Sequence, residues 1–343
     1  MLIIATVGPN TSDKKILKSL INGGVNVLRF NFSHGNIKDF NFELKEARGI
    51  KKEIYILQDL SGRKIRVCDS LPYIIKIYNN EEVIFCGEVA YKNDKFSLLS
   101  RKIIPLNLKS KELVDNSVSE ISMKDNTMQF KIISKLEEGI LAIVIKGGIV
   151  RAGKGCNIKK FNRSKMGLSP KDKEDLKWGV KNSVNIICQS FVESKEDIIN
   201  VNTYIKSINK VEGYSPKIWA KIESKAGIEN INSIIDEVDG ILIGRGDMIP
   251  EVSLIETPIL QEMVINRTIA KGKDIILGTH LLDSMKDGRT PNLPEVESIY
   301  YHIKNGVQGF LLAGETSVGK APIKTVEFLN KILCKYNENN NKR

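Results

Sequence analysis

The chain has 343 residues, of which 41% are hydrophobic and 27% charged, and a formal net charge of +11. This composition is typical of a soluble globular protein, and no stretch approaches the roughly 20 consecutive apolar residues of a membrane span. Binding to nucleic-acid phosphates needs clustered cations, whereas the lysines here alternate with acidic residues, as in SDKKILKSL and SPKDKEDLK. We therefore expect neither a membrane nor a nucleic-acid partner. The five cysteines are scattered without a CxxC pair, which argues against a zinc or disulfide framework and predicts a cytoplasmic location.

The chain alternates short β-branched stretches with amphipathic segments. Helical patterns include SDKKILKSLINGG, with a Ser/Asp start and a Gly stop, GIENINSIIDEV and LPEVESIYYHIKNG. The expected strands are residues 2–8, 26–33, 54–59, 185–191, 217–223, 240–247, 274–280 and 307–314. Eight near-continuous apolar strands with helical crossovers predict a parallel sheet buried on both faces, and eight is the strand count of a (β/α)₈ TIM barrel.

Residues 67–160 break this rhythm, because they contain short strand patterns joined by Asn, Asp and Gly turns. We interpret them as a β-rich lid domain inserted after the third strand. The barrel is then divided into residues 1–66, with strands 1–3, and residues 161–336, with strands 4–8, followed by a polar tail at 337–343. Without the insertion about 250 residues remain, which is the usual length of a barrel.

Polar residues gather at the carboxyl ends of the expected strands, which converge at one mouth of a barrel. Any one of them is more often an ordinary solvated residue, but so many on different strands indicate a site. They are Thr6, Arg29, Asn31, Ser33, Asp59, Lys221, Glu223, Arg245, Asp247, Thr279 and Glu315.

The stretch WAKIES, residues 219–224, is the most informative of these. Lys221 and Glu223 share one side of a strand, and neither the barrel interior nor the helix layer accepts charge except at the mouth. The following IGRGD adds a second carboxylate, Asp247, after two glycines. Two carboxylates and a lysine suit a divalent cation beside a phosphate; a purely structural Lys–Glu pair is the alternative.

The stretch GIVRAGKG, residues 148–155, nearly matches a phosphate-binding P-loop. Its last residue, Gly155, stands where that loop needs a hydroxyl that binds the metal, and no convincing helix pattern follows. It therefore fails as an independent P-loop.

Six motifs together resemble those of the pyruvate kinase family, in order and spacing, from residue 2 to about 334. They are ATVGPNTSD, LINGGVNVLRFNFSHG, QDLSGRKIR, WAKIESKAGIENINSIIDEVDGILIGRGD, GTHLLDSM and LLAGETSVGKAP. The resemblance implies a barrel interrupted after strand three by a β-rich lid. It also implies transfer of the phosphoryl group of phosphoenolpyruvate to ADP, giving pyruvate and ATP, with a divalent cation.

The resemblance assigns a role to each matched residue. Glu223 and Asp247 would bind Mg²⁺ or Mn²⁺. Lys221, Thr279 and Arg29 would be catalytic, with Lys221 neutralising the transferred group and Thr279 organising protonation of the enolate. The substrate site would comprise Lys221, Gly246, Asp247, Thr279, Arg29 and Arg66, and the nucleotide site Pro9, Asn31, His34, Arg66 and Lys154.

The chain also departs from the family pattern. Lys64 stands where an acidic residue is usual, as in a subgroup in which a lysine replaces the potassium ion, with Asn31, Ser33 and Asp59 nearby. We therefore expect activity without K⁺. Further departures that leave nucleotide preference and catalytic vigour open are Arg63, His280, Asp283 and Ala313.

Three functional hypotheses follow. The first is an active pyruvate kinase without effector control through a C-terminal domain, forming at most a homodimer through the barrel. The second is a paralogue acting on another enol phosphate or acceptor. The third is a degenerate relative that binds phosphoenolpyruvate or nucleotide as a sensor.

Overall fold

The computed structural model describes residues 1–96, 99–115, 118–123, 126–159, 161–163 and 166–340. The chain divides into two compact units, which we describe separately. The first unit comprises residues 1–62, 167–248 and 255–343, and the second comprises residues 63–166 and 249–254.

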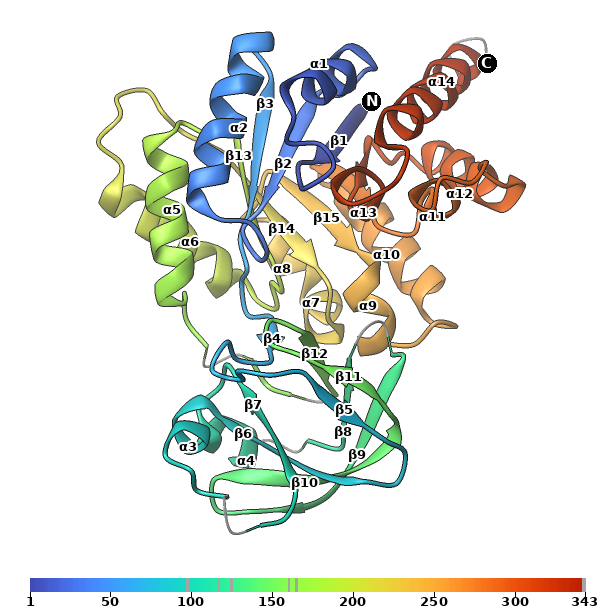
Figure 1. Ribbon diagram of the computed structural model, residues 1–343. Coiled ribbons are helices and arrows are strands. Elements are labelled where there is room, and N and C mark those ends of the chain that lie inside the picture. The colour runs from blue at the N-terminus through green and yellow to red at the C-terminus, as the bar shows by residue number, and fades with distance from the viewer. Residues whose placement is uncertain (97–98, 116–117, 124–125, 160, 164–165, 341–343) are drawn as a thin grey trace. The chain divides into compact units, whose positions relative to one another are not determined.

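The first unit is built around a closed barrel of parallel strands, in the order β1-β17-β16-β15-β14-β13-β3-β2, with helices outside it (Figure 1). The predicted α/β barrel is therefore confirmed. Its strands are β1 (Leu2–Thr6), β2 (Val27–Asn31), β3 (Tyr55–Asp59), β13 (Ile186–Gln189), β14 (Lys217–Ile222), β15 (Gly240–Gly244), β16 (Asp274–Gly278) and β17 (Gly309–Leu312).

Several of these strands end earlier than the sequence predicts. Residues 240–247 were expected as one strand, but β15 stops at Gly244 and helix α9 (Arg245–Glu251) begins at the next residue. Asp247 therefore lies in the first turn of a helix and not on a strand. The alternation of apolar residues does not reveal this change because α9 begins with the polar residues Arg245, Gly246 and Asp247.

Helix boundaries follow local capping chemistry. Asp13 accepts hydrogen bonds from the backbone N–H groups of Lys15 and Ile16 and so starts α1. The segment GIENINSIIDEV, expected as one helix, is split at Asn230 into α7 and α8. Besides α9, the helices of the first unit are α1 (Lys14–Asn22), α2 (Ile37–Ile50), α5 (Pro170–Lys181), α6 (Lys195–Ile208), α7 (Lys225–Glu229), α8 (Ile231–Ile235), α10 (Thr257–Ala270), α11 (Asp283–Lys286), α12 (Leu293–Lys304), α13 (Gly314–Ser317) and α14 (Pro322–Asn340).

A single apolar layer fills the middle of the barrel. Each strand contributes an inward side chain to it, and the layer consists of Ile4, Val27, Leu57, Ile186, Cys188, Trp219, Leu242, Ile276 and Leu311. Side chains alternate along a strand, so the residue two positions further on faces the same interior. On β1, β2, β3 and β14 that next residue is Thr6, Arg29, Asp59 or Lys221. The polar residues therefore form the layer nearest the carboxyl ends of the strands.

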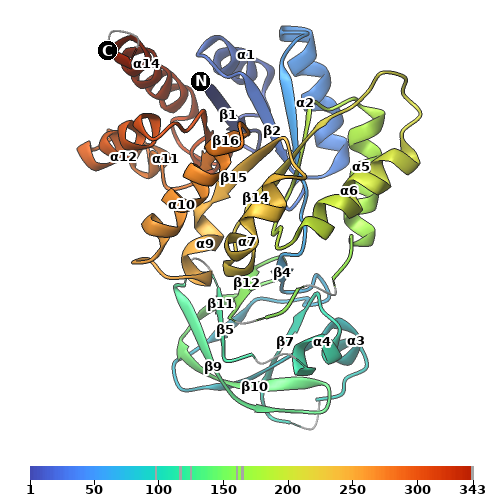
Figure 2. The same ribbon diagram turned by 180° about the vertical axis from the view of Figure 1, so that it is seen from behind.

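The second unit is a β-rich domain (Figure 2). Its seven-stranded sheet has the order β4-β12-β8-β9-β10-β6-β7, and β11 pairs with β5. Phe85 and Phe130 meet edge to face in its core, with ring centroids 5.0 Å apart. The strands are β4 (Ile65–Arg66), β5 (Ile75–Ile77), β6 (Glu82–Gly87), β7 (Lys102–Leu106), β8 (Glu120–Met123), β9 (Met128–Lys135), β10 (Gly139–Lys146), β11 (Gly148–Val150) and β12 (Gly155–Ile158).

The second unit differs in detail from the expected insertion at 67–160. It spans residues 63–166 and includes residues 249–254, which are the last residues of α9 and the segment after it. It also contains two short helices, α3 (Glu88–Lys92) and α4 (Ser110–Asp115), of which α3 falls in a stretch interpreted as strands. At the other end of the chain, α14 continues to Asn340, so residues 337–340 of the expected polar tail are helical, and residues 341–343 lie outside the described residues.

Within the described part of the chain, no helix has the length and apolarity needed to cross a membrane.

Candidate functional site

Asp59, the last residue of β3, is the centre of a charged network at the barrel mouth. Its carboxylate oxygen Oδ2 accepts hydrogen bonds from Arg29 Nε at 2.7 Å and Lys221 Nζ at 3.3 Å, and Arg29 NH2 lies 2.6 Å from it. Its Oδ1 accepts a hydrogen bond from Ser190 Oγ at 2.9 Å. Asp59 is 1% exposed. One buried carboxylate therefore joins cations from β2 and β14.

Lys221 lies between two carboxylates. Its Nζ is 3.3 Å from Asp59 Oδ2 and 3.3 Å from Glu223 Oε1, and it donates to Ser190 Oγ at 3.1 Å. Burial lowers the pKa of Lys221, but the charges of Asp59 and Glu223 outweigh burial and hold that pKa above its ordinary value. Burial likewise raises the pKa of Asp59, but Lys221 and Arg29 hold it below its ordinary value. Lys221 therefore carries its positive charge at neutral pH.

Glu223 has a geometry that suits a metal ligand. It is 2% exposed, its Oε2 accepts the backbone N–H of Phe191 at 3.1 Å, and a Cβ on Gly244 would come within 2.9 Å of its Oε1. Gly244 thus leaves room for this carboxylate beside the start of α9, whose first turn carries half-buried Asp247. Among the described residues, no group of three or more His, Cys, Asp or Glu side chains is placed to hold a metal alone. Two hard carboxylates fit Mg²⁺, which usually completes its shell with water and substrate oxygens.

Thr279 lies beyond β16, opposite the start of α9. Its Oγ1 accepts the backbone N–H of Gly246 at 3.0 Å and donates to the Gly278 carbonyl at 2.6 Å. Thr279 has a φ of 65° and His280 a φ of 51°, both in the left-handed region. A β-branched residue there is an outlier that costs about 1–3 kcal/mol and persists only where its surroundings enforce it. The backbone at this point is therefore held in place by other groups.

The remaining predicted residues of the first unit lie at the end of β2 and in the loops that follow β1 and β2. Asn31, at the end of β2, accepts the Ser33 N–H on its side-chain oxygen and the His34 N–H on its carbonyl, both at 3.1 Å. Ser33 is half-buried, His34 is exposed, and Pro9 is exposed in the loop after β1. Asn31, Ser33 and His34 thus form one turn at the end of β2, where Asn31 is the register partner of Asp59.

Arg66, Lys154 and Lys64 belong to the second unit. Arg66, on β4, pairs with Gly155 of β12 and donates from NH1 to the Gly153 carbonyl at 2.9 Å. Lys154 Nζ contacts Met128 Sδ at 3.3 Å and the Ile149 carbonyl. The near P-loop, residues 148–155, thus consists of β11, a turn, and the first residue of β12. It brings Arg66 and Lys154 together within this unit.

Ser190 and Phe191 were not singled out from the sequence. Ser190 contacts both Asp59 and Lys221, and Phe191, with a φ of 52°, presents its N–H to Glu223. The alternation of side chains along the strand could have identified Ser190, because it follows Cys188, which faces the barrel interior, by two positions at the end of β13. A hydroxyl in that position belongs to the same polar layer as Asp59.

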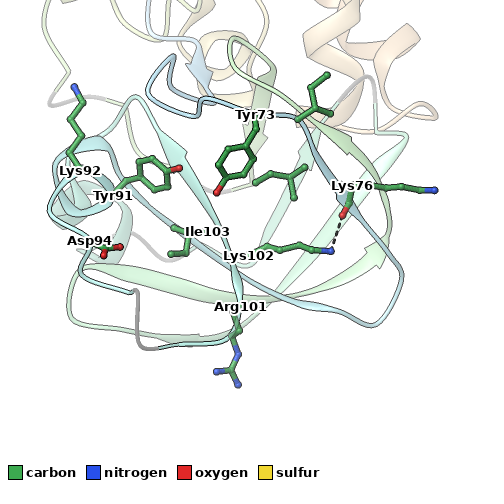
Figure 3. Close-up of a pocket in the computed structure, with 10 residues that line it drawn as sticks. Tyr73, Lys76, Tyr91, Lys92, Asp94, Arg101, Lys102 and Ile103 are labelled. Atoms are coloured by element: carbon green, nitrogen blue, oxygen red, sulfur yellow. Dashed lines mark hydrogen bonds between the residues drawn. The ribbon is translucent and has the colours of Figure 1, made fainter.

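A further pocket of about 670 Å³ lies in the second unit (Figure 3). Tyr73, Tyr91 and Ile103 line it, and the side chain of Arg101 points away from it. Lys102 Nζ donates to the Lys76 carbonyl at 2.8 Å and pairs with Glu81. Arg101 in turn pairs with Glu82, so Lys102 and Arg101 are both engaged with carboxylates of the same unit.

The fold and its strand ends together define a (β/α)₈-barrel protein with a buried cluster of charged side chains at the carboxyl ends of its strands. A family model described as the barrel domain of pyruvate kinase matches residues 1–326. The chain belongs to the pyruvate kinase family.

Curated relatives agree with this assignment. The chain is 30% identical over 340 residues to the pyruvate kinase of Thermococcus litoralis, covering 96% of this chain and 68% of that protein. It is 29% identical over 337 residues to that of Sporosarcina psychrophila and 30% over 336 residues to that of Staphylococcus aureus strain MRSA252, in both cases covering 96% of this chain and 56% of the relative. The chain thus spans between about half and two thirds of the length of these relatives.

Proposed function

We propose that this protein is a pyruvate kinase that transfers the phosphoryl group of phosphoenolpyruvate to ADP, giving pyruvate and ATP. The observation that carries the proposal is the Lys221 ammonium, held between Asp59 and Glu223 at the mouth. Phosphoryl transfer requires little covalent chemistry from the protein, so positioning and neutralisation of charge carry the catalysis. A cation fixed by two buried carboxylates is preorganised for that task.

Each residue has a part in the proposed reaction. Arg29, whose guanidinium plane is fixed by Asp59 and Thr6, would bind the phosphate of the substrate. Lys221 would neutralise the phosphoryl group during transfer and then the enolate oxygen. The N–H groups of Gly246 and Asp247 and the Thr279 hydroxyl would hold the substrate carboxylate. Because Lys221 stays protonated, the proton that converts enolate to ketone would arrive through Thr279 and water.

Glu223 and Asp247 would hold the divalent cation. When bound there, Mg²⁺ or Mn²⁺ supplies positive charge that stabilises the phosphate and carboxylate oxygens of the substrate. Nucleotide binding by Pro9, Asn31 and His34, and by Arg66 and Lys154, stays a prediction of the family resemblance.

The proposal is tested with a coupled assay of pyruvate formation from phosphoenolpyruvate, ADP and Mg²⁺. We expect Lys221→Met to lower kcat about 10³-fold, because it removes the central cation, while Mn²⁺ binding measured by calorimetry is retained. Lys217→Met is the matched control on the same strand: its exposed ion pair with Asp274 lies at the other end of β14, so activity is expected to be unchanged. Tight binding of phosphoenolpyruvate without turnover would instead support a sensor, and turnover of another enol phosphate a paralogue.

We also propose that activity does not require K⁺, because Lys64 supplies a cation five residues after Asp59. The rate with tetramethylammonium as the only monovalent cation should match the rate with K⁺. Lys64→Glu, which restores the acid usual in the family, should make the enzyme dependent on K⁺. Strong activation of the unmodified protein by K⁺ would contradict the proposal.

Homodimerisation through the barrel stays a prediction of the family resemblance, and a cytoplasmic location stays a prediction from the scattered cysteines.

A further inference from the structure

Arg245 is a buried cation for which the proposed reaction has no use. It is the first residue of α9, directly after β15, and is 8% exposed. Its Nε donates to the Thr279 carbonyl at 3.0 Å, and its NH2 donates to the His280 carbonyl at 2.7 Å and also contacts the Thr279 carbonyl. A planar guanidinium suits two adjacent oxygens, whereas an ammonium group lacks this fork.

The two carbonyls that Arg245 binds belong to Thr279 and His280, two consecutive residues that both have left-handed backbone. Neither is a glycine, so neither adopts this conformation readily by itself. The guanidinium of an arginine is charged at neutral pH, and a charged donor makes a stronger hydrogen bond to a carbonyl than a neutral one. The Arg245 guanidinium therefore bridges the carbonyls of Thr279 and His280 where the backbone is strained, and we call this arrangement the clamp.

Strand register explains why the clamp closes at this place. Gly244 of β15 pairs with Gly278 of β16, so Arg245 and Thr279 are the next residue on each side. Arg245 binds the Thr279 carbonyl, and the neighbouring Gly246 donates its N–H to the Thr279 hydroxyl oxygen. The side chain of Arg245 thus holds the carbonyl of Thr279, and the backbone N–H of Gly246 holds its hydroxyl oxygen.

We infer that Arg245 is a positioning residue, which holds Thr279 and His280 in the left-handed conformation and so keeps the Thr279 hydroxyl beside the Gly246 N–H. This inference rests on the proposed function, in which that hydroxyl binds the substrate carboxylate and organises protonation. Without the clamp, Thr279 relaxes toward an ordinary backbone conformation and its hydroxyl moves away. A displacement of about 1 Å at such a group costs on the order of 100-fold in rate.

The kinetic test is a double-mutant cycle between Arg245 and Thr279. We expect Arg245→Lys to lower kcat about 100-fold in the unmodified protein but less than threefold in a Thr279→Val background, because the hydroxyl that Arg245 positions is already absent. Equal losses in both backgrounds would overturn the inference and indicate a merely structural role. If Arg245→Lys does not fold, Arg245→Gln, which keeps one amide donor without a buried charge, takes its place.

A rescue experiment separates the clamp from other roles of Arg245. Glycine adopts left-handed backbone at little cost, whereas alanine does not. Adding His280→Gly to the Arg245→Lys protein is therefore expected to raise kcat about tenfold, whereas adding His280→Ala is expected to leave kcat unchanged. Equal effects of the two substitutions would contradict the inference.

The chain offers a matched control in Arg48. It also binds two consecutive carbonyls, those of Asn182 and Ser183, and Ser183 has a φ of 46°, but this clamp lies after α5 and not at the mouth. Arg48→Lys is expected to leave kcat within twofold of the unmodified protein. A 100-fold loss in Arg48→Lys would overturn the site-specific interpretation.

A readout without turnover keeps this inference distinct from the proposed function. The ¹³C-methyl resonance of Thr279, identified by its loss in Thr279→Val, should shift in Arg245→Lys and return toward its original position when His280→Gly is added. An unshifted resonance would overturn the clamp. If the protein shows no pyruvate kinase turnover but the resonance behaves as expected, the proposed function fails and the clamp stands.

Discussion

At the scale of single residues, a few buried charges define the mouth of the barrel. Asp59 would be unstable as an isolated buried carboxylate, and it is tolerated because Arg29 and Lys221 compensate its charge and Ser190 satisfies its second oxygen. The same contacts keep Lys221 protonated. Stability and the proposed catalysis therefore depend on the same ion pairs.

Glu43 is the opposite case, a buried carboxyl that lacks such compensation by charge. It lies on α2 and is 5% exposed, and burial, with the charge of Asp39, raises its pKa to about 7. Between about pH 4.5 and 7 the folded state therefore holds a proton that the unfolded chain has lost, so stability falls as the pH rises through this window.

We predict that Glu43→Gln is more stable than the unmodified protein at pH 8 by about 1 kcal/mol, allowing for partial screening by solvent. The gain should disappear by pH 4, where both states bind the proton. Urea unfolding at the two pH values measures the difference. The control is Glu174→Gln, an exposed glutamate paired with Lys177, for which no such pH-dependent gain is expected.

At the scale of elements, the ends of helices and strands follow from local chemistry that the sequence displays. Asp13 was expected at the start of the first helix, and it caps α1. The apolar runs likewise located all eight barrel strands. What they did not reveal was where β15 ends and α9 begins, because α9 starts with the polar residues Arg245, Gly246 and Asp247.

The cap of α1 is open to a direct test. Asp13→Ala should lower the free energy of unfolding by about 1 kcal/mol, because two backbone N–H groups lose their acceptor. Asp13→Ser, which retains a capping oxygen, should lose much less. Thermal denaturation followed by circular dichroism distinguishes the two, and equal losses would show that the hydrogen bonds of the cap are not the cause.

At the scale of the whole molecule, the two units have cores of different kinds. The first lies inside a parallel barrel and the second within an antiparallel-rich sheet. Both tryptophans of the chain, Trp178 and Trp219, belong to the first unit. Tryptophan fluorescence therefore reports on the barrel alone, whereas circular dichroism reports on both units.

We predict that Phe85→Ala destabilises the second unit by about 3 kcal/mol, because it removes a fully buried ring that packs on Phe130. Unfolding followed by circular dichroism should then begin at lower urea concentration, while the fluorescence transition keeps its midpoint. Phe42→Ala, on an exposed side chain, is the control. A parallel shift of both transitions would mean that the two units unfold together.

The sequence by itself determined the architecture and the polar character of the strand ends. Apolar period and capping are local properties, so they can be read from neighbouring residues. Lys221 and Glu223 were identified in this way, since their alternation within WAKIES places both on the inner side of one strand.

The tertiary structure alone decided which of these groups meet. The partner of Lys221 is Asp59, 162 positions away in the chain, and Ser190 joins the pair from another strand. Arg245 reaches the carbonyls of Thr279 and His280 only because β15 and β16 are neighbours in register. Such contacts depend on how the barrel closes and how its strands are staggered, and no local pattern carries that information.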